Sequence, residues 1–174
     1  PQVFDAYILL SSLYSKRQQF DKSIDLLKEL IAHTPREVIG YFYLGRVYEV
    51  KDDLPNAEKL FRQALSIDPS KVEVSTDLLR VLLKEKKVDA VKVLCNQLLE
   101  QDPSNVVARK VLGQLLISEN QLDQALKHLE VLQTVENDPT DTRYKIALIE
   151  LERQNFSDAI RELSLVVAKR PDFA

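Results

Sequence analysis

The most regular stretch of the sequence, residues 38–71, reads VIGYFYLGRVYEVKDDLPNAEKLFRQALSIDPSK. We predict a first helix over about 38–51 and a second helix over about 54–67. Asp53 is placed to cap the second helix, and Pro55 falls in its first turn, where a missing backbone N–H costs nothing. The stretch is therefore predicted to form two helices joined by a short turn.

The same pattern recurs along the chain. Pro35, Pro69 and Pro103 stand 34 residues apart, and Pro171 lies at twice that interval beyond Pro103. Segments of 34 residues follow one another five times without insertion or deletion, over 4–37, 38–71, 72–105, 106–139 and 140–173. Two positions have the same character in all five segments, and we call each set of equivalent residues a column. One column is apolar (Leu10, Leu44, Leu78, Leu112 and Ile146), and the other is mostly small (Ser23, Ala57, Val91, Ala125 and Ala159). These columns predict an array of repeats in place of one domain with a single core.

The composition agrees with helices throughout. Of 174 residues only three are glycine, too few for the turns of a β-sandwich or barrel, while 45% are hydrophobic and 29% charged. First helices are expected over about 4–17, 38–51, 72–85, 106–119 and 140–153, and second helices over about 21–33, 54–67, 88–101, 122–135 and 156–169. In the fourth segment Asn137 takes the closing proline position and Pro139 follows, which predicts a longer second helix or an altered turn.

The repeat resembles the tetratricopeptide repeat, whose 34 residues carry W-x2-L-G-x2-Y, then A-x3-F, then P. The second segment matches best, through Tyr41, Leu44, Gly45, Tyr48, Ala57, Phe61, Ala64 and Pro69. The resemblance implies an all-α, right-handed superhelical solenoid of antiparallel helix pairs, with ten helices in five repeats. It also implies a non-enzymatic scaffold or adaptor that binds a peptide, a helix or a partner protein in a concave groove lined by the first helices.

Charge and motifs exclude several other classes of protein. The net charge is −3, from 24 Lys and Arg against 27 Asp and Glu, so no excess of cations is available for nucleic acid. The longest apolar runs, such as 6–10, fall far short of the roughly 20 residues of a membrane-spanning helix. Cys95 is predicted to be buried, and His33 and His128 lack the spacing of metal ligands. We expect no catalytic residue, cofactor or metal site.

The groove residues can be named through the family's pattern, which places them at positions 2, 5, 6, 9, 12 and 13 of each repeat. The predicted partner-binding residues among these positions are Ile8, Leu9, Ile39, Phe42, Tyr43, Arg46, Asp77, Arg80, Lys110, Gln114 and Tyr144. Glu73 and Asp77 stand where the carboxylate clamp of chaperone-binding relatives carries cations, so that clamp is not expected. A second interpretation is that Arg46 and Arg80 pair with Asp77, Glu73 or Glu49 and only keep the groove soluble.

Two further functions remain open from the sequence. Leu163, Val166 and Val167 are expected to form an apolar face through which copies of the chain associate into a homo-oligomeric scaffold. Alternatively, the array is the recruiting arm of a larger enzyme. The closing residues 171–174 resemble the opening of another repeat, so we expect a fragment of a longer repeat protein. The start at Pro1, without any methionine, is compatible with a native N-terminus that has been cut away, and the compartment is left open between cytoplasm and periplasm.

Overall fold

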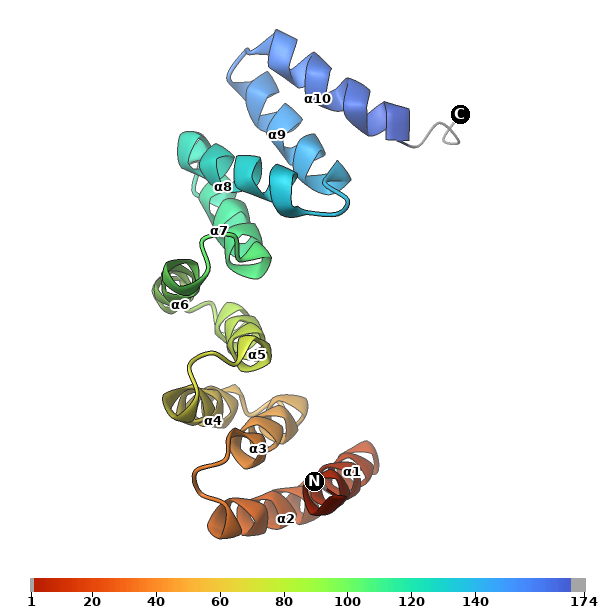
Figure 1. The fold of residues 1–174 in the computed structure, drawn as a ribbon, viewed down its shortest axis with the longest axis vertical. Helices are drawn as coiled ribbons and strands as arrows, with labels where there is room; N and C mark the ends of the chain where they lie inside the picture. Colours follow the sequence, from red (N-terminus) through yellow and green to blue (C-terminus); the bar gives the residue numbers. More distant parts are fainter. Residues whose placement is uncertain (1, 170–174) are drawn as a thin grey trace. The chain divides into compact units, whose positions relative to one another are not determined.

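The computed structural model describes residues 2–169, which form ten α-helices and no strand (Figure 1). The helices are α1 (Gln2–Lys16), α2 (Phe20–His33), α3 (Val38–Val50), α4 (Leu54–Ile67), α5 (Val72–Lys84), α6 (Val88–Gln101), α7 (Val106–Ser118), α8 (Leu122–Val135), α9 (Thr140–Glu152) and α10 (Phe156–Lys169). The all-α repeat architecture expected from the sequence is confirmed. Pro171, the last member of the proline column, lies outside the described residues.

The helix bounds follow the 34-residue period. The first helices α3, α5, α7 and α9 begin at the predicted residues and end one residue early, because the next residue is the C-cap. The second helices α4, α6, α8 and α10 have the predicted bounds. Asp53 caps α4 as expected, since its side chain accepts a hydrogen bond from the Asn56 N–H at 3.3 Å.

A left-handed residue reverses the chain in every repeat. The turn between the first and second helix contains one non-glycine residue with positive φ: Gln18 (59°), Asp52 (65°), Lys86 (57°), Asn120 (58°) and Gln154 (61°). These five residues are 34 positions apart, although their residue types vary and none is glycine. One left-handed residue makes a tight reversal, which lets the two helices of a pair pack against each other.

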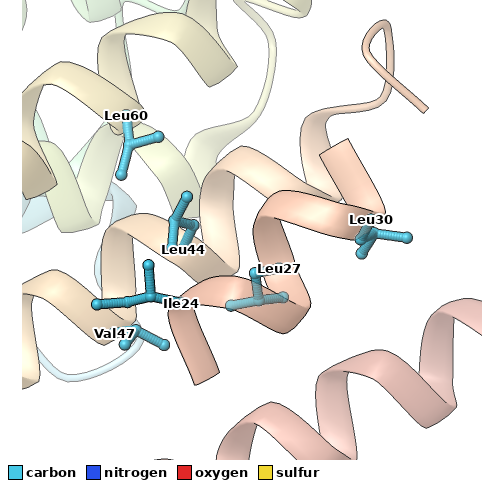
Figure 2. Packing of buried hydrophobic residues seen from close by; sticks show 6 residues of the cluster. All are labelled: Ile24, Leu27, Leu30, Leu44, Val47 and Leu60. Carbon is cyan, nitrogen blue, oxygen red and sulfur yellow. The ribbon is translucent and has the colours of Figure 1, made fainter. Parts of the chain in front are cut away.

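The chain divides into two units, residues 1–91 and 92–174, and the boundary falls within α6. In the first unit α1 packs on α2 and α3 on α4, and the pairs are joined by contacts of α2 with α3 and of α4 with α5. The first helices also touch, α1 with α3 and α3 with α5. Figure 2 shows part of the core between α2, α3 and α4, formed by Ile24, Leu27, Leu30, Leu44, Val47 and Leu60.

Small residues allow the close approach of helices within the first two pairs. A Cβ placed on Gly45 of α3 would lie 2.6 Å from the Phe61 ring of α4, so the bare glycine backbone makes room for that ring. In the first repeat Ser11 of α1 and Ser23 of α2 take the two small positions, and their buried hydroxyls hydrogen-bond at 2.8 Å. The small columns read from the sequence therefore mark where helices pack closely.

In the second unit α7 packs on α8, α9 on α10, and α8 on α9. A buried carboxylate, Glu162 of α10, accepts hydrogen bonds from Gln133 of α8 at 2.6 Å and from Arg143 of α9 at 2.7 Å. Three helices thus contact one side chain.

The turn before α9 has the altered form, and α8 is not lengthened. Helix α8 ends at Val135. In the turn, Asp138 accepts hydrogen bonds from the Thr140 N–H at 3.2 Å and from the Thr140 hydroxyl at 2.6 Å.

The three apolar residues of α10 singled out from the sequence are exposed to different degrees. Val167 is exposed, but Leu163 and Val166 are only half-exposed. The other large apolar side chains of this helix that are exposed are Phe156, Ile160 and Leu165. The reason is the helical repeat, because Phe156, Ile160, Leu163 and Val167 follow one another at intervals of three and four and form a single stripe.

Candidate functional site

The first helices of the first unit border a groove, and Tyr43 and Arg46 of α3 stand at its centre. On one side lies a cavity of about 240 Å³ between α1 and α3, lined by Ile8, Ser11, Ser12, Ser15, Tyr43, Arg46, Val47 and Val50. On the other side lies a cavity of about 430 Å³ between α3 and α5, lined by Phe42, Tyr43, Arg46, Val72, Glu73, Thr76 and Asp77. We call these two cavities and the ridge between them the α3 groove.

A third cavity continues the groove toward the beginnings of α3 and α5. It has a volume of about 540 Å³, and Ile39, Phe42, Tyr43 and Glu73 line it together with residues of the two preceding loops. Its wall carries charges of both signs, among them Arg36, Lys71 and Asp68, whereas Arg46 is the one charged residue lining the α1–α3 cavity. The groove is therefore most apolar where α1 faces α3.

Aromatic packing fixes the ridge. Phe42 is only 8% exposed, and its ring lies edge-on to Tyr43, with the ring centres 5.2 Å apart. The Phe42 ring also packs against Phe61 of α4, at 6.1 Å. The Arg46 guanidinium lies over the Phe42 ring, with its carbon 5.4 Å from the ring centre, in the geometry of a cation–π contact. Phe42 thus forms the floor of the groove, and Tyr43 and Arg46 form its surface.

Ion pairs connect α3 with α5. Arg80 binds Asp77 at 2.5 Å and Glu49 at 3.0 Å, and Lys84 binds the same oxygen of Glu49 at 2.8 Å. Arg46 approaches Asp77 only at 3.5 Å, and that Asp77 oxygen is buried without a hydrogen bond. Arg46 and Arg80 therefore both pair with carboxylates of the groove, as one of the two interpretations of the sequence expects. Arg80 is held more closely than Arg46.

The predicted site residues fall into separate places. Ile8, Ile39, Phe42, Tyr43, Arg46 and Asp77 line the cavities around α3. Leu9 is exposed and lines none of the cavities described above, and Arg80 belongs to the ion-pair network. The sequence did not single out Ser12, Ser15, Val50 or Thr76, although all four occupy groove columns of their repeats.

The predicted residues of the second unit have different surroundings from one another. Lys110 pairs with Glu136 at 2.6 Å, and Gln114 is exposed on α7. Tyr144 borders a separate cavity of about 390 Å³ with Asp138, Thr140, Asp141 and Val166. Among the described cavities, those around α3 are the ones that several predicted residues share.

Burial shifts the pKa of two titratable groups that lie away from the α3 groove. Cys95 is fully buried, and burial raises the pKa of its thiol to about 12, which agrees with the predicted buried position. Burial, with a smaller contribution from nearby Arg109, lowers the pKa of His128. Among residues 2–169 no three His, Cys, Asp or Glu side chains come together as a metal site would require. Within the same range no helix combines the length and apolar character needed to cross a membrane.

Comparison with models of protein families identifies the family of this chain. Two tetratricopeptide repeat models match, one over residues 8–72 and the other over residues 51–115 and 82–150. The chain belongs to the tetratricopeptide repeat (TPR) family. TPR proteins are typically non-catalytic scaffolds for protein–protein interaction, and this chain has their fold.

Solved TPR structures resemble the chain over nearly its whole length. YrrB, described as a TPR protein with an unusual peptide-binding site, is 21% identical, with a TM-score of 0.69, over 96% of this chain and 86% of its own. A MamA structure is 15% identical, with a TM-score of 0.76, over 97% and 92% of the two chains. MamA from Desulfovibrio magneticus RS-1 is 16% identical, with a TM-score of 0.73, over 98% and 97%. No curated protein matches the sequence closely enough to count as a relative.

Proposed function

We propose that this TPR chain binds a segment of a partner protein in the α3 groove. The observation that carries the proposal is the position of Tyr43 and Arg46, which line both the α1–α3 and the α3–α5 cavity. A partner segment crossing this ridge would place side chains in both cavities at once. YrrB, which shares the fold, is described as having a peptide-binding site, and this supports a peptide or helix as the partner.

The wall of the α1–α3 cavity favours one chemistry in the partner. Ile8, Val47 and Val50 offer apolar contact, and the Ser12 hydroxyl can hydrogen-bond with a peptide backbone. The Ser15 hydroxyl donates to Ser23 at 3.1 Å and can still accept a hydrogen bond from the peptide. A volume of about 240 Å³ admits an aliphatic side chain of the partner. The α1–α3 cavity therefore suits an apolar residue of the partner segment.

Arg46 favours a carboxylate beside that apolar residue. Half of its side chain is exposed, and its only ion pair among the described residues is the 3.5 Å approach of its Nε to Asp77. The outer N–H groups of the guanidinium are free to take a carboxylate in the two-pronged geometry that arginine prefers. The proposed partner segment therefore carries Asp or Glu next to an aliphatic residue.

Selection of random peptides displayed on phage tests the proposal. We expect the folded chain to enrich peptides in which Asp or Glu adjoins an aliphatic residue. Arg46→Ala should weaken binding of the enriched peptide at least about tenfold, because a charge-assisted contact near the centre of the site is lost. Arg62→Ala is the matched control: Arg62 is as exposed as Arg46, but it lies on α4 and pairs with Glu58.

The aromatic contribution is tested at Tyr43 and not at Phe42. Phe42 is buried, so Phe42→Ala would open a cavity in the core and confuse unfolding with loss of binding. Tyr43→Ala should also weaken the enriched peptide, while circular dichroism shows unchanged helicity. Failure to enrich any peptide, or binding that survives both Arg46→Ala and Tyr43→Ala, would contradict the proposal.

A further inference from the structure

Two hydroxyl protons on the α1 wall of the groove are already used inside the protein. Ser23 of α2 donates to the Ser11 carbonyl oxygen at 3.0 Å, an atom that only accepts. Because this bond uses the single hydroxyl proton of Ser23, the Ser23 oxygen is the acceptor in its contacts with the hydroxyls of Ser11 at 2.8 Å and Ser15 at 3.1 Å. Ser11 and Ser15 therefore direct their protons toward α2, and only their lone pairs are left for the α1–α3 cavity that they line.

The α5 wall of the groove has the same character. Thr76 lines the α3–α5 cavity, and its hydroxyl donates to the Val72 carbonyl oxygen of its own helix at 2.8 Å. Only the lone pairs of the Thr76 hydroxyl are left for a ligand. The other polar residues that α5 contributes to this cavity are Glu73 and Asp77, whose carboxylates accept hydrogen bonds and donate none. The α5 wall therefore offers acceptors.

The donors of the groove belong mainly to its central ridge. Tyr43 and Arg46 of α3 carry O–H and N–H groups, and both residues line both cavities. On the α1 wall Ser12 also keeps a proton to donate, because its hydroxyl makes no hydrogen bond among residues 2–169. The groove thus has donors along α3, between an acceptor at Ser15 on one side and an acceptor at Thr76 on the other.

A backbone in extended conformation matches these two acceptors. Every N–H of an extended segment is free to donate to a group outside the segment. In the interior of a helix each N–H is bonded to the carbonyl four residues earlier, so only the first turn has free donors. A helix therefore donates from one end, whereas the acceptors lie on both sides of α3. An acceptor that the partner covers without supplying a donor loses its hydrogen bond to water, which weakens binding.

We infer that the partner segment lies extended in the α3 groove and donates one backbone N–H to Ser15 of α1 and another to Thr76 of α5. The inference rests on the proposed function, and it selects an extended peptide over a helix as the partner. The carboxylate of the segment remains at Arg46, between the two N–H groups. Ser15 and Thr76 are then the residues that read the conformation of the partner's backbone, while Arg46 reads its charge.

Replacement of single amides by esters in the phage-selected peptide tests the inference. Each ester removes one N–H donor and keeps every side chain. Two of the esters should weaken binding to the wild-type chain by about fivefold each, the effect of one lost hydrogen bond. Ser15→Ala should remove the effect of one ester and Thr76→Val the effect of the other, because the acceptor is then already missing. Comparison with these variants also separates the lost N–H from the weaker ester carbonyl.

Thr134→Val is the matched control, because the Thr134 hydroxyl also donates to a carbonyl of its own helix, that of Val131 at 2.7 Å, but is exposed on α8. It should leave both ester effects unchanged, and circular dichroism shows that each variant is folded. A peptide that depends on Arg46 but tolerates every ester would overturn this inference and leave the proposed function in place. Ester effects that persist in Ser15→Ala and Thr76→Val would do the same. Failure to enrich any peptide would overturn both.

Discussion

Gly45 and Gly113 occupy the same repeat position but have different surroundings. A Cβ on Gly45 would lie 2.6 Å from the Phe61 ring, whereas on Gly113 it would meet Leu129 at an ordinary 3.4 Å. Gly45→Ala should therefore destabilise the chain by about 1–3 kcal/mol through overpacking. Gly113→Ala should be neutral or stabilise it by up to about 1 kcal/mol, because alanine favours the helix. Urea unfolding of both variants measures the difference; equal effects would contradict this account of the small column.

The left-handed residues give a second prediction at this scale. Lys86 is exposed with φ of 57°, a conformation that disfavours residues with a Cβ. Lys86→Gly should stabilise the chain by about 1 kcal/mol, because glycine adopts this region without steric cost. Lys59→Gly, in the exposed middle of α4, should instead destabilise it by about 1 kcal/mol. Thermal unfolding of the two variants is the measurement, and a loss of stability in Lys86→Gly would be the contrary result.

Two features of single residues could not be predicted from the sequence: the left-handed turn residues and the burial of Phe42. The left-handed column could not be read from residue types, because Gln18, Lys86 and Gln154 have no preference for this conformation. Its only signal in the sequence is the 34-residue spacing of the turns. Phe42 was predicted to belong to the groove surface, but its column also faces Phe61, and packing against that ring buries it.

At the scale of elements, Glu162 fastens α10 to α8 and α9. Glu162→Ala leaves Arg143 and Gln133 without their acceptor, and we expect a loss of about 2–4 kcal/mol in the free energy of unfolding. Glu130→Ala, on the exposed side of α8, should change stability by less than about 0.5 kcal/mol. Chemical denaturation compares the two, and a loss in Glu162→Ala no larger than the control would contradict the role of this side chain.

The turns before the first helices give the chain a sensitivity to acid. The side chains of Asp68 and Asp102 each accept hydrogen bonds from the hydroxyl and N–H of the serine two residues on, and these bonds lower the pKa of both aspartates below the ordinary 3.8. Because the folded state holds these carboxylates ionised, their contribution is present above pH 3.8 and is lost as the pH falls through the lowered pKa values.

Replacing both carboxylates should flatten this dependence. The double variant Asp68→Asn and Asp102→Asn should lose less thermal stability than the wild type between about pH 5 and about pH 2. Asp25→Asn is the control, because Asp25 is exposed and has no ion pair or side-chain hydrogen bond within residues 2–169. A double variant whose melting temperature falls as steeply as that of the wild type would contradict the assignment.

Element bounds were the most predictable level of the structure. Nine of the ten helices begin within one residue of the expected position, because the small and apolar columns set the register for every repeat at once. For the turn after α8 the sequence predicts either a longer second helix or an altered turn. The structure selects the altered turn, since Asp138 binds Thr140 as Asp68 binds Ser70 two repeats earlier.

At the scale of the whole molecule, the period of the sequence predicts the family but only part of the site. Columns identified Tyr43 and Arg46 as groove residues, and the pairing of Arg80 with Asp77 was one of two interpretations from the same columns. Which cation is held closely and which only loosely depends on distances between α3 and α5 that no pattern of residue types contains. The cavity that Tyr144 lines with Asp138, Thr140, Asp141 and Val166 depends on packing in the same way.

The central claim is that the α3 groove is the surface that recognises a partner. Amide chemical-shift mapping with the phage-selected peptide tests it most directly. We predict that the largest shifts occur at groove residues of α1, α3 and α5, with Ile8, Tyr43, Arg46 and Thr76 among them, and that Arg46→Ala reduces them. Shifts concentrated on α2 and α4, or confined to the second unit, would contradict the claim.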